Sequence, residues 1–209
     1  MLRRSGYDLS DWTQKKYTLG LDFPNLPFWL EGSGLRITQS QAILLHAAKK
    51  ARLMGATDEA RAQALELLGV SADLRDAFVT LSYGDFDAGR GGFVSGPLAS
   101  TVKSLEAFAA KSAGPYLLGG ACRCAALAAL RCADAPLPRS CPAAELTFVD
   151  FVWADLLEQL VTLEPACLAA APTLKKLIDA VYALPNVAAY RASPAYIDRP
   201  YNNKMAKFK

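Results

Sequence analysis

The stretch from residue 12 to residue 40, WTQKKYTLGLDFPNLPFWLEGSGLRITQS, decides how the first part of the chain folds. Between residues 23 and 37, short apolar runs alternate with turn residues, first PNLP at 24–27 and then GSG at 32–34. This alternation is typical of a β-hairpin. Ser40 then opens QAILLHAAKKARL, whose apolar residues recur at helical spacing and whose basic residues lie in the last turns, where they favour the helix dipole. The first fifty residues therefore predict two strands followed by a helix.

Downstream of a short linker at 54–57, the chain predicts helices and loops. Thr57 is a candidate N-cap, because Asp58 and Glu59 follow it as an acidic first turn. Later apolar stripes at helical spacing indicate buried faces rather than a cofactor site. Their members are Leu74, Phe78 and Leu81, then Leu98, Val102, Leu105 and Phe108, then Leu174, Leu177, Ile178 and Val181.

The sharpest helix start in this half is Thr147 followed by Asp150. A Thr and an acidic residue at this spacing form a capping box, which has a purely structural explanation. Just before it, residues 119–144, GGACRCAALAALRCADAPLPRSCPAA, interrupt the helical pattern. We predict that they are an insertion.

Composition excludes several classes of protein. The 209 residues are 52% hydrophobic and 21% charged, which is enough for one large domain or two small ones. The net charge of +3 is spread along the chain without a basic block, so nucleic-acid binding is not expected. No run approaches 18 uninterrupted apolar residues, and no apolar stretch follows the basic start. A soluble, cytoplasmic protein without membrane association is predicted.

The cysteines and the histidine argue against metal and nucleophile chemistry. Four cysteines lie between residues 122 and 141, and Cys167 stands alone, which matches no even disulfide framework and suits a reducing cytosol. The four thiols could hold zinc, but Cys-x-Cys lacks the usual spacing, and a mobile loop or a gene-model artefact is the alternative. His46 is the single histidine and lies in an apolar helical run, so a catalytic pair has little support. We predict no metal site.

Several motifs together resemble glutathione transferases of the Mu class. They are DFPNLP at 22–27, ITQS at 37–40, ADLRDAFVTLSYGDFD at 72–87, TFVDF at 147–151 and the ending RPYNNKMAKFK at 199–209. The resemblance implies an α/β thioredoxin-like first domain, partial here at residues 1–53. It implies an all-helical transferase domain at residues 57–209, with the insertion at about 119–144. The implied protein is a cytoplasmic homodimer that conjugates reduced glutathione to hydrophobic electrophiles by thiolate attack, a detoxification reaction.

The resemblance also implies where glutathione binds in the first domain. Trp12 and Lys16 would hold the glycyl carboxylate through the indole N–H and the ammonium group. Otherwise Trp12 is a half-buried aromatic residue and Lys16 a solvated charge. Asn25, Leu26 and Pro27 would form a turn with a cis proline, in which the backbone of Leu26 pairs with the cysteinyl residue. Otherwise this is an ordinary turn.

The remaining implied contacts come from two helices. Gln39 and Ser40 enter the first, where Ser40 and the backbone N–H groups would bind the γ-glutamyl carboxylate. Ser40 can also be a simple N-cap. Asp73 would reach the glutathione amine of a second subunit, or be a solvated helix charge. Tyr83 would lie beside the electrophile and Arg75 along the substrate wall.

This chain differs from the family pattern at the catalytic tyrosine. In the family, the first strand, helix and second strand, and the tyrosine that activates the sulfur, precede the anchor region, and neither Tyr7 nor Tyr17 stands at a matching place. We therefore assign no catalytic residue, and no cofactor beyond glutathione as co-substrate. Two alternatives stay open: a non-catalytic glutathione-binding or structural protein, and an incomplete gene model whose upstream segment carries the tyrosine.

Overall fold

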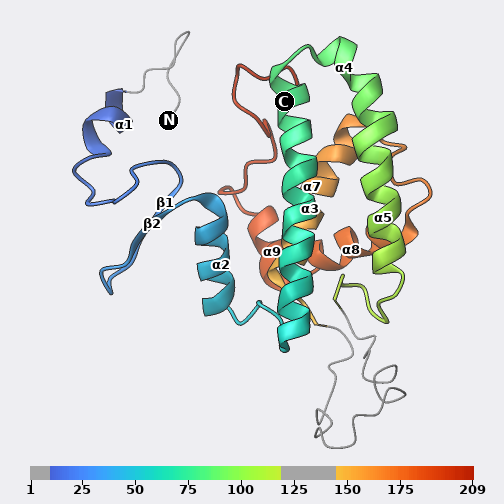
Figure 1. Ribbon diagram of the computed structural model, residues 1–209, viewed down its shortest axis with the longest axis horizontal. Coiled ribbons are helices and arrows are strands. Elements are labelled where there is room, and N and C mark those ends of the chain that lie inside the picture. The colour runs from blue at the N-terminus through green and yellow to red at the C-terminus, as the bar shows by residue number, and fades with distance from the viewer. Residues whose placement is uncertain (1–9, 119–144) are drawn as a thin grey trace, which may run out of the picture. The chain divides into compact units, whose positions relative to one another are not determined.

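The computed structural model describes residues 10–118 and 145–209 (Figure 1). The chain separates into two compact units, a first unit of Met1–Leu53 and a second unit of Met54–Lys209. The predicted insertion at about 119–144 and Tyr7 lie outside the described residues. Within the described residues, the helices are all too short or too polar to cross a membrane.

The first unit contains the predicted hairpin and helix. Strand β1 (Phe28–Leu30) pairs antiparallel with β2 (Arg36–Thr38), and α2 (Ser40–Lys50) follows. Helix α1 (Ser10–Lys15) was not predicted, because it has six residues, none of them buried, and so carries no apolar stripe.

Polar contacts connect the hairpin to the segments on either side of it. The hydroxyl of Thr38 donates to the carbonyl of Phe23 at 2.9 Å, and the guanidinium of Arg36 donates to the carbonyl of Leu19. On the other side, Glu31 pairs with Lys50 of α2. The loop that holds the Asn-Leu-Pro turn is thereby anchored to β2.

The second unit is helical throughout its described residues. Its helices are α3 (Asp58–Tyr83), α4 (Phe86–Phe93), the π-helical turn η1 (Val94–Leu98), α5 (Ala99–Ala109), α7 (Phe148–Leu163), α8 (Pro172–Tyr182) and α9 (Pro185–Arg191). Thr57 caps α3 as predicted, accepting a hydrogen bond from the Ala60 N–H at 3.1 Å. Pro97 lies inside η1, where a residue without an N–H interrupts the regular helical pattern.

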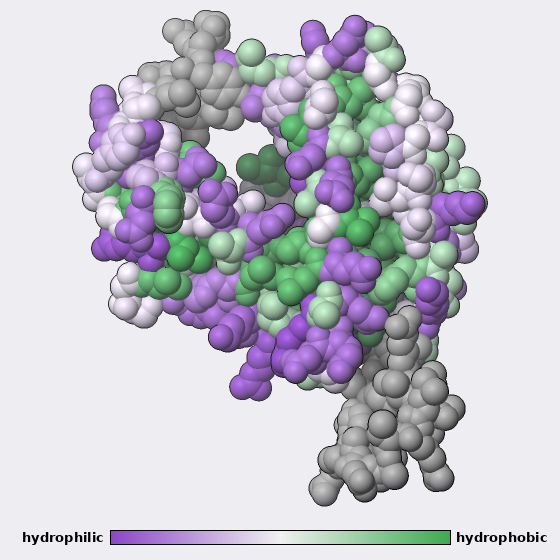
Figure 2. All heavy atoms as spheres, viewed as in Figure 1, coloured by the Kyte–Doolittle hydropathy of each residue, from purple (hydrophilic) through white to green (hydrophobic). Residues whose placement is uncertain are grey.

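Helix α7 forms the centre of the second unit and packs against both α3 and α8. Trp153, Leu156, Leu157 and Leu160 are completely buried, and the indole of Trp153 donates to the Leu67 carbonyl of α3 at 3.2 Å. The predicted apolar stripes are buried, except for the half-buried Phe108 and Ile178. Further hydrophobic residues of α3, namely Leu65, Val70, Val79 and Tyr83, are exposed. Figure 2 shows hydrophobic residues interspersed with hydrophilic ones over the visible face of the second unit.

The predicted capping box begins α7. The carboxylate of Asp150 accepts hydrogen bonds from the backbone N–H of Thr147 at 2.7 Å and from its hydroxyl at 3.0 Å. The other carboxylate oxygen accepts from the Leu117 N–H at 2.7 Å. Burial raises the pKa of Asp150 above its ordinary value despite these hydrogen bonds. One side chain thus fixes both the start of α7 and the end of the preceding described segment.

Candidate functional site

Trp12 and Lys16 lie at the start of the first unit. The Trp12 ring stacks on Phe28 of β1, with ring centroids 5.9 Å apart and planes 11° from parallel. Lys16 follows α1, and its ammonium group lies 4.6 Å from the centroid of the Tyr17 ring. The stacking holds α1 against the hairpin, and Phe28 is a positioning residue that the sequence did not reveal.

The Asn-Leu-Pro turn has the predicted cis peptide bond between Leu26 and Pro27. Leu26 is 55% exposed, which leaves this turn accessible to a ligand. The Leu26 N–H, however, donates to the side-chain oxygen of Asn25 at 2.9 Å. A peptide ligand that pairs with this N–H must therefore displace the Asn25 side chain.

Gln39 has an unusual backbone conformation at the entrance of α2. Its φ of 73° and ψ of 117° lie in a left-handed region that side chains rarely adopt. Gln39 is the N-cap, and Ser40 is the first helical residue, which corrects the alternative in which Ser40 is the cap. Neither a side-chain cap nor an acidic residue serves the first turn of α2. The first N–H groups of α2 are therefore not occupied by a side chain of this turn and can bind an anionic ligand.

The other three predicted site residues lie on α3 of the second unit. Asp73 is exposed, and Tyr83, the last residue of α3, is 43% exposed. Arg75 donates to the carboxylate of Asp155 on α7 at 3.1 Å. The predicted residues are thus divided, with Trp12, Lys16, Asn25, Leu26, Pro27, Gln39 and Ser40 in the first unit.

The C-terminal segment docks beside Tyr83. The backbone N–H of Lys207 donates to the Ser82 carbonyl at 2.7 Å, and the Phe208 ring packs 5.1 Å from that of Phe78. The ending RPYNNKMAKFK, identified by resemblance, is therefore attached to the end of α3 that presents Tyr83.

Cys167 is half-buried and has a free thiol. Burial, with the nearby Glu164 carboxylate, raises the pKa of this thiol to about 11. Because the thiolate is the nucleophile and the metal ligand, Cys167 suits neither role at neutral pH. Among the described residues, no group of three or more His, Cys, Asp or Glu is placed to hold a metal ion.

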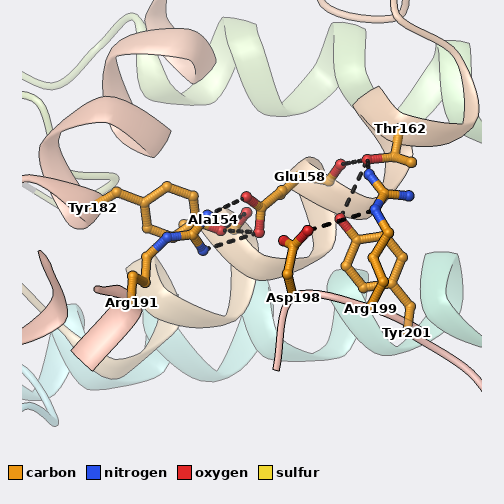
Figure 3. A network of polar contacts seen from close by, with 8 residues as sticks. All are labelled: Ala154, Glu158, Thr162, Tyr182, Arg191, Asp198, Arg199 and Tyr201. Carbon is orange, nitrogen blue, oxygen red and sulfur yellow. Dashed lines mark hydrogen bonds and ion pairs between the residues drawn. The ribbon is translucent and has the colours of Figure 1, made fainter. Parts of the chain in front are cut away.

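A polar network that the sequence did not predict centres on Glu158 of α7 (Figure 3). Its carboxylate accepts from both terminal nitrogens of Arg191, at 2.6 and 3.2 Å, and from the Tyr182 hydroxyl at 2.8 Å. The Arg191 guanidinium lies 3.9 Å from the centroid of the Tyr182 ring and 4.8 Å from that of Tyr196. The hydrogen bond to Glu158 raises the pKa of Arg191, while burial, reinforced by Glu158, raises that of Tyr182.

Comparison with known proteins identifies the family. Residues 143–194 match the model of the glutathione S-transferase C-terminal domain. The chain is 34% identical over 201 residues to glutathione S-transferase Mu 2 of Pongo abelii, covering 96% of this chain and 79% of that protein. This chain belongs to the glutathione S-transferase family. Glutathione S-transferase B of Cavia porcellus is 32% identical, with 96% of this chain and 80% of that protein covered.

Solved glutathione S-transferases confirm the fold. The structure of Blo t 8 superposes with a TM-score of 0.76 at 21% identity, covering 99% of this chain and 86% of that one. The Pi-class transferase of Onchocerca volvulus superposes with a TM-score of 0.68 at 19% identity, covering 87% and 75%. The predicted fold, a small sheet region followed by a helical domain in a Mu-like transferase, is thus confirmed.

Proposed function

We propose that this glutathione S-transferase homologue binds reduced glutathione in its first unit and conjugates it to electrophilic small molecules. The observation that carries the proposal is the entrance of α2. Holding Gln39 at a positive φ costs on the order of 1–3 kcal/mol, and such strain is concentrated at ligand-binding sites. The strained residue lies where the first N–H groups of an eleven-residue helix lack a side-chain cap.

The charges of the first unit suit the ligand. Glutathione carries two carboxylates, and the implied contacts offer Lys16 and the Trp12 indole for one and the start of α2 for the other. A helix start and an ammonium group both favour anions. The exposed Leu26 turn supplies backbone groups for the peptide between them.

The residues that we assign to the electrophile lie on α3 of the second unit. Because Arg75 is paired with Asp155, it is less suited to contact a substrate than Tyr83 is. Val79 lies four residues before Tyr83 on the same helical face, and both are exposed. Tyr83 and Val79 therefore form the apolar surface that we assign to the electrophile.

Conjugation forms a bond between the glutathione sulfur and an electrophilic carbon. With chlorodinitrobenzene, the sulfur attacks the ring carbon, and chloride leaves with the electron pair of the broken bond. The thiol proton must be lost first, and an unperturbed thiol has a pKa of about 8.5. Binding without turnover is the second candidate, because none of the ten site residues supplies a group for the sulfur.

The test combines calorimetric titration with glutathione and a chlorodinitrobenzene assay. Gln39→Ala and Lys16→Ala should each weaken binding about tenfold or more, equivalent to about 1.4 kcal/mol. Their matched controls, Gln41→Ala and Lys49→Ala, alter exposed residues of α2 outside the assigned contacts and should bind normally. Binding with turnover supports the transferase, and binding alone supports the non-catalytic candidate. Equal affinity in all four variants would remove the assigned site.

A further inference from the structure

A cavity of about 400 Å³ opens in the second unit between α7, α9 and the segment after α9. None of the ten residues assigned to glutathione or the electrophile lines it. Its walls contain four tyrosines, three carboxylates and one guanidinium, the last belonging to Arg191. This lining combines aromatic faces with negative charge, which is the environment that organic cations prefer.

One part of the cavity, which we call the inner half, is lined by Glu158, Tyr182 and Arg191 and already holds a cation of the chain itself. The Arg191 guanidinium lies against the rings of Tyr182 and Tyr196, and Glu158 binds it through two hydrogen bonds. Figure 3 shows Arg191 and Tyr182 together on one side of Glu158. Side-chain exposures of 27% for Arg191 and 24% for Glu158 show that this pair is partly shielded from water. The inner half thus shows that tyrosine rings and a carboxylate of this cavity hold a guanidinium group.

The rest of the lining, which we call the outer half, contains Tyr190, Asp155 and Asp198. Its carboxylates pair with arginines that are more exposed than Arg191, namely Arg75 on Asp155 at 3.1 Å and Arg199 on Asp198 at 3.8 Å. Tyr190 packs edge-on against Tyr196, with centroids 5.6 Å apart, and is 54% exposed. The Tyr190 ring is thus open to solvent in the outer half of the cavity.

Both carboxylates retain hydrogen-bonding capacity. Arg199 lies 3.8 Å from Asp198, too far for a hydrogen bond, and the Asp198 side chain is 65% exposed. Arg75 and Gln159 both donate to the same oxygen of Asp155, Oδ2. An ionised carboxylate has about four lone-pair sites, so a ligand's N–H donors can still be accepted.

We propose that the outer half of this cavity binds a planar organic cation of the amidinium or guanidinium class that carries an aromatic or apolar body. The cationic plane stacks on Tyr190, as the Arg191 guanidinium lies over Tyr182, and its N–H groups donate to Asp198 or Asp155. Because the cavity is separate from the residues assigned to glutathione, this binding goes beyond the transferase function.

The test is a calorimetric titration of the full chain with benzamidine, benzamide and benzoate, which share one shape and differ in charge. Benzamidine should bind at least tenfold more tightly than neutral benzamide, and benzoate should not bind. Raising the salt concentration should weaken benzamidine binding, because the outer carboxylates are exposed. Equal affinity for benzamidine and benzamide, or no benzamidine binding, would overturn the proposal.

Variants then place the ligand in the cavity. Asp198→Asn and Tyr190→Leu should each weaken benzamidine binding about tenfold, with the circular dichroism of the fold unchanged. Asp179→Asn is the matched control, since it removes an exposed carboxylate of α8 that does not line the cavity. Unchanged affinity in both cavity variants, or an equal loss in the control, would show that benzamidine binds elsewhere and contradict the assignment.

Discussion

Gln39 has a role that is separable from the stability of the first unit. It is the N-cap of α2 and has a positive φ, but its side chain makes no capping hydrogen bond. A glycine would adopt this backbone conformation at little steric cost. A glutamine is therefore best explained by a contact of its amide or backbone with a ligand.

Gln39→Gly should stabilise the first unit and weaken glutathione binding at the same time. Relief of the left-handed strain, partly offset by the greater flexibility of glycine in the unfolded chain, should raise the free energy of unfolding by about 1 kcal/mol. Urea denaturation and calorimetric titration measure the two effects. Tighter or unchanged glutathione binding in Gln39→Gly would mean that the strain has no connection with this ligand.

Glu158 is the residue on which the polar network of the second unit depends. Glu158→Gln removes the charge that faces Arg191 and weakens the acceptor of the Tyr182 hydroxyl. Hydrogen bonds to charged groups contribute about 1.5–3 kcal/mol, so we expect a loss of about 2 kcal/mol in urea denaturation. Asp179→Asn provides the baseline for an exposed carboxylate. Equal free energies of unfolding for Glu158→Gln and Asp179→Asn would show that the network does not stabilise the second unit.

At the scale of elements, helix ends in the second unit are fixed by carboxylates from two sources. Asp150 serves its own helix, whereas Glu106 of α5 reaches α8 and accepts from the N–H groups of Thr173 and Leu174, both at 3.0 Å. Burial alone would raise the pKa of Glu106, but these hydrogen bonds outweigh it and leave the pKa lowered from 4.5. The negative charge also favours the positive end of the α8 dipole.

This arrangement predicts an acid-sensitive contact between α5 and α8. Because the folded pKa of Glu106 is below its unfolded value, its stabilisation is fully present above about pH 4.5 and is lost as the pH falls through the lower folded pKa. The pKa of Asp150 is raised in the folded protein, so ionisation of this carboxyl group destabilises the fold as the pH rises above its ordinary pKa of 3.8. Glu106→Gln should therefore be less stable at pH 7 and lose less stability between pH 5 and pH 3.

Urea denaturation at each pH measures the free energy of unfolding of Glu106→Gln and of the parent chain. Glu66→Gln, which alters an exposed carboxylate on α3, is the matched control. A Glu106→Gln profile parallel to that of the parent chain would show that the carboxylate does not stabilise α8.

Elements with local signals were predictable from the sequence. Thr147 and Asp150 are three residues apart, so the capping box was visible in the chain itself, as were the hairpin turns and the Thr57 cap. Helix α1 was missed because it has no buried residue. The Glu158–Arg191 pair spans 33 residues, and nothing near either residue indicates the other. The hydrogen bond from the Leu26 N–H to the Asn25 side chain is not predictable from the motif, because the motif indicates only that this N–H is available to a ligand.

The whole molecule combines two units that carry different parts of the proposed chemistry. The first has the implied glutathione contacts, and α3 of the second has the exposed Tyr83 and Val79. Exposed apolar residues on α3 are typical of an interaction surface, and Leu65 and Val70 belong to them. The homodimer implied by resemblance to Mu-class transferases remains a prediction.

If the protein is a homodimer, sedimentation equilibrium should give twice the 22.4 kDa mass of the chain. Leu65→Lys should weaken the association, because it places a charge on an exposed apolar position of α3, whereas Glu66→Lys beside it serves as a charge control.

Asp73→Asn should also weaken glutathione binding if Asp73 reaches the second subunit's ligand. A single species of 22.4 kDa would remove the basis for that contact.

The central claim is that glutathione binds along the first unit, from α1 through the Leu26 turn to the start of α2. The most direct measurement is a map of backbone amide NMR shifts during titration of the isotope-labelled chain with reduced glutathione. The account predicts that the largest shifts fall at Lys16, Leu26, Gln39 and Ser40, and that the Leu26 amide changes as Asn25 is displaced. Saturable shifts confined to the second unit, or no shifts at millimolar glutathione, would contradict it.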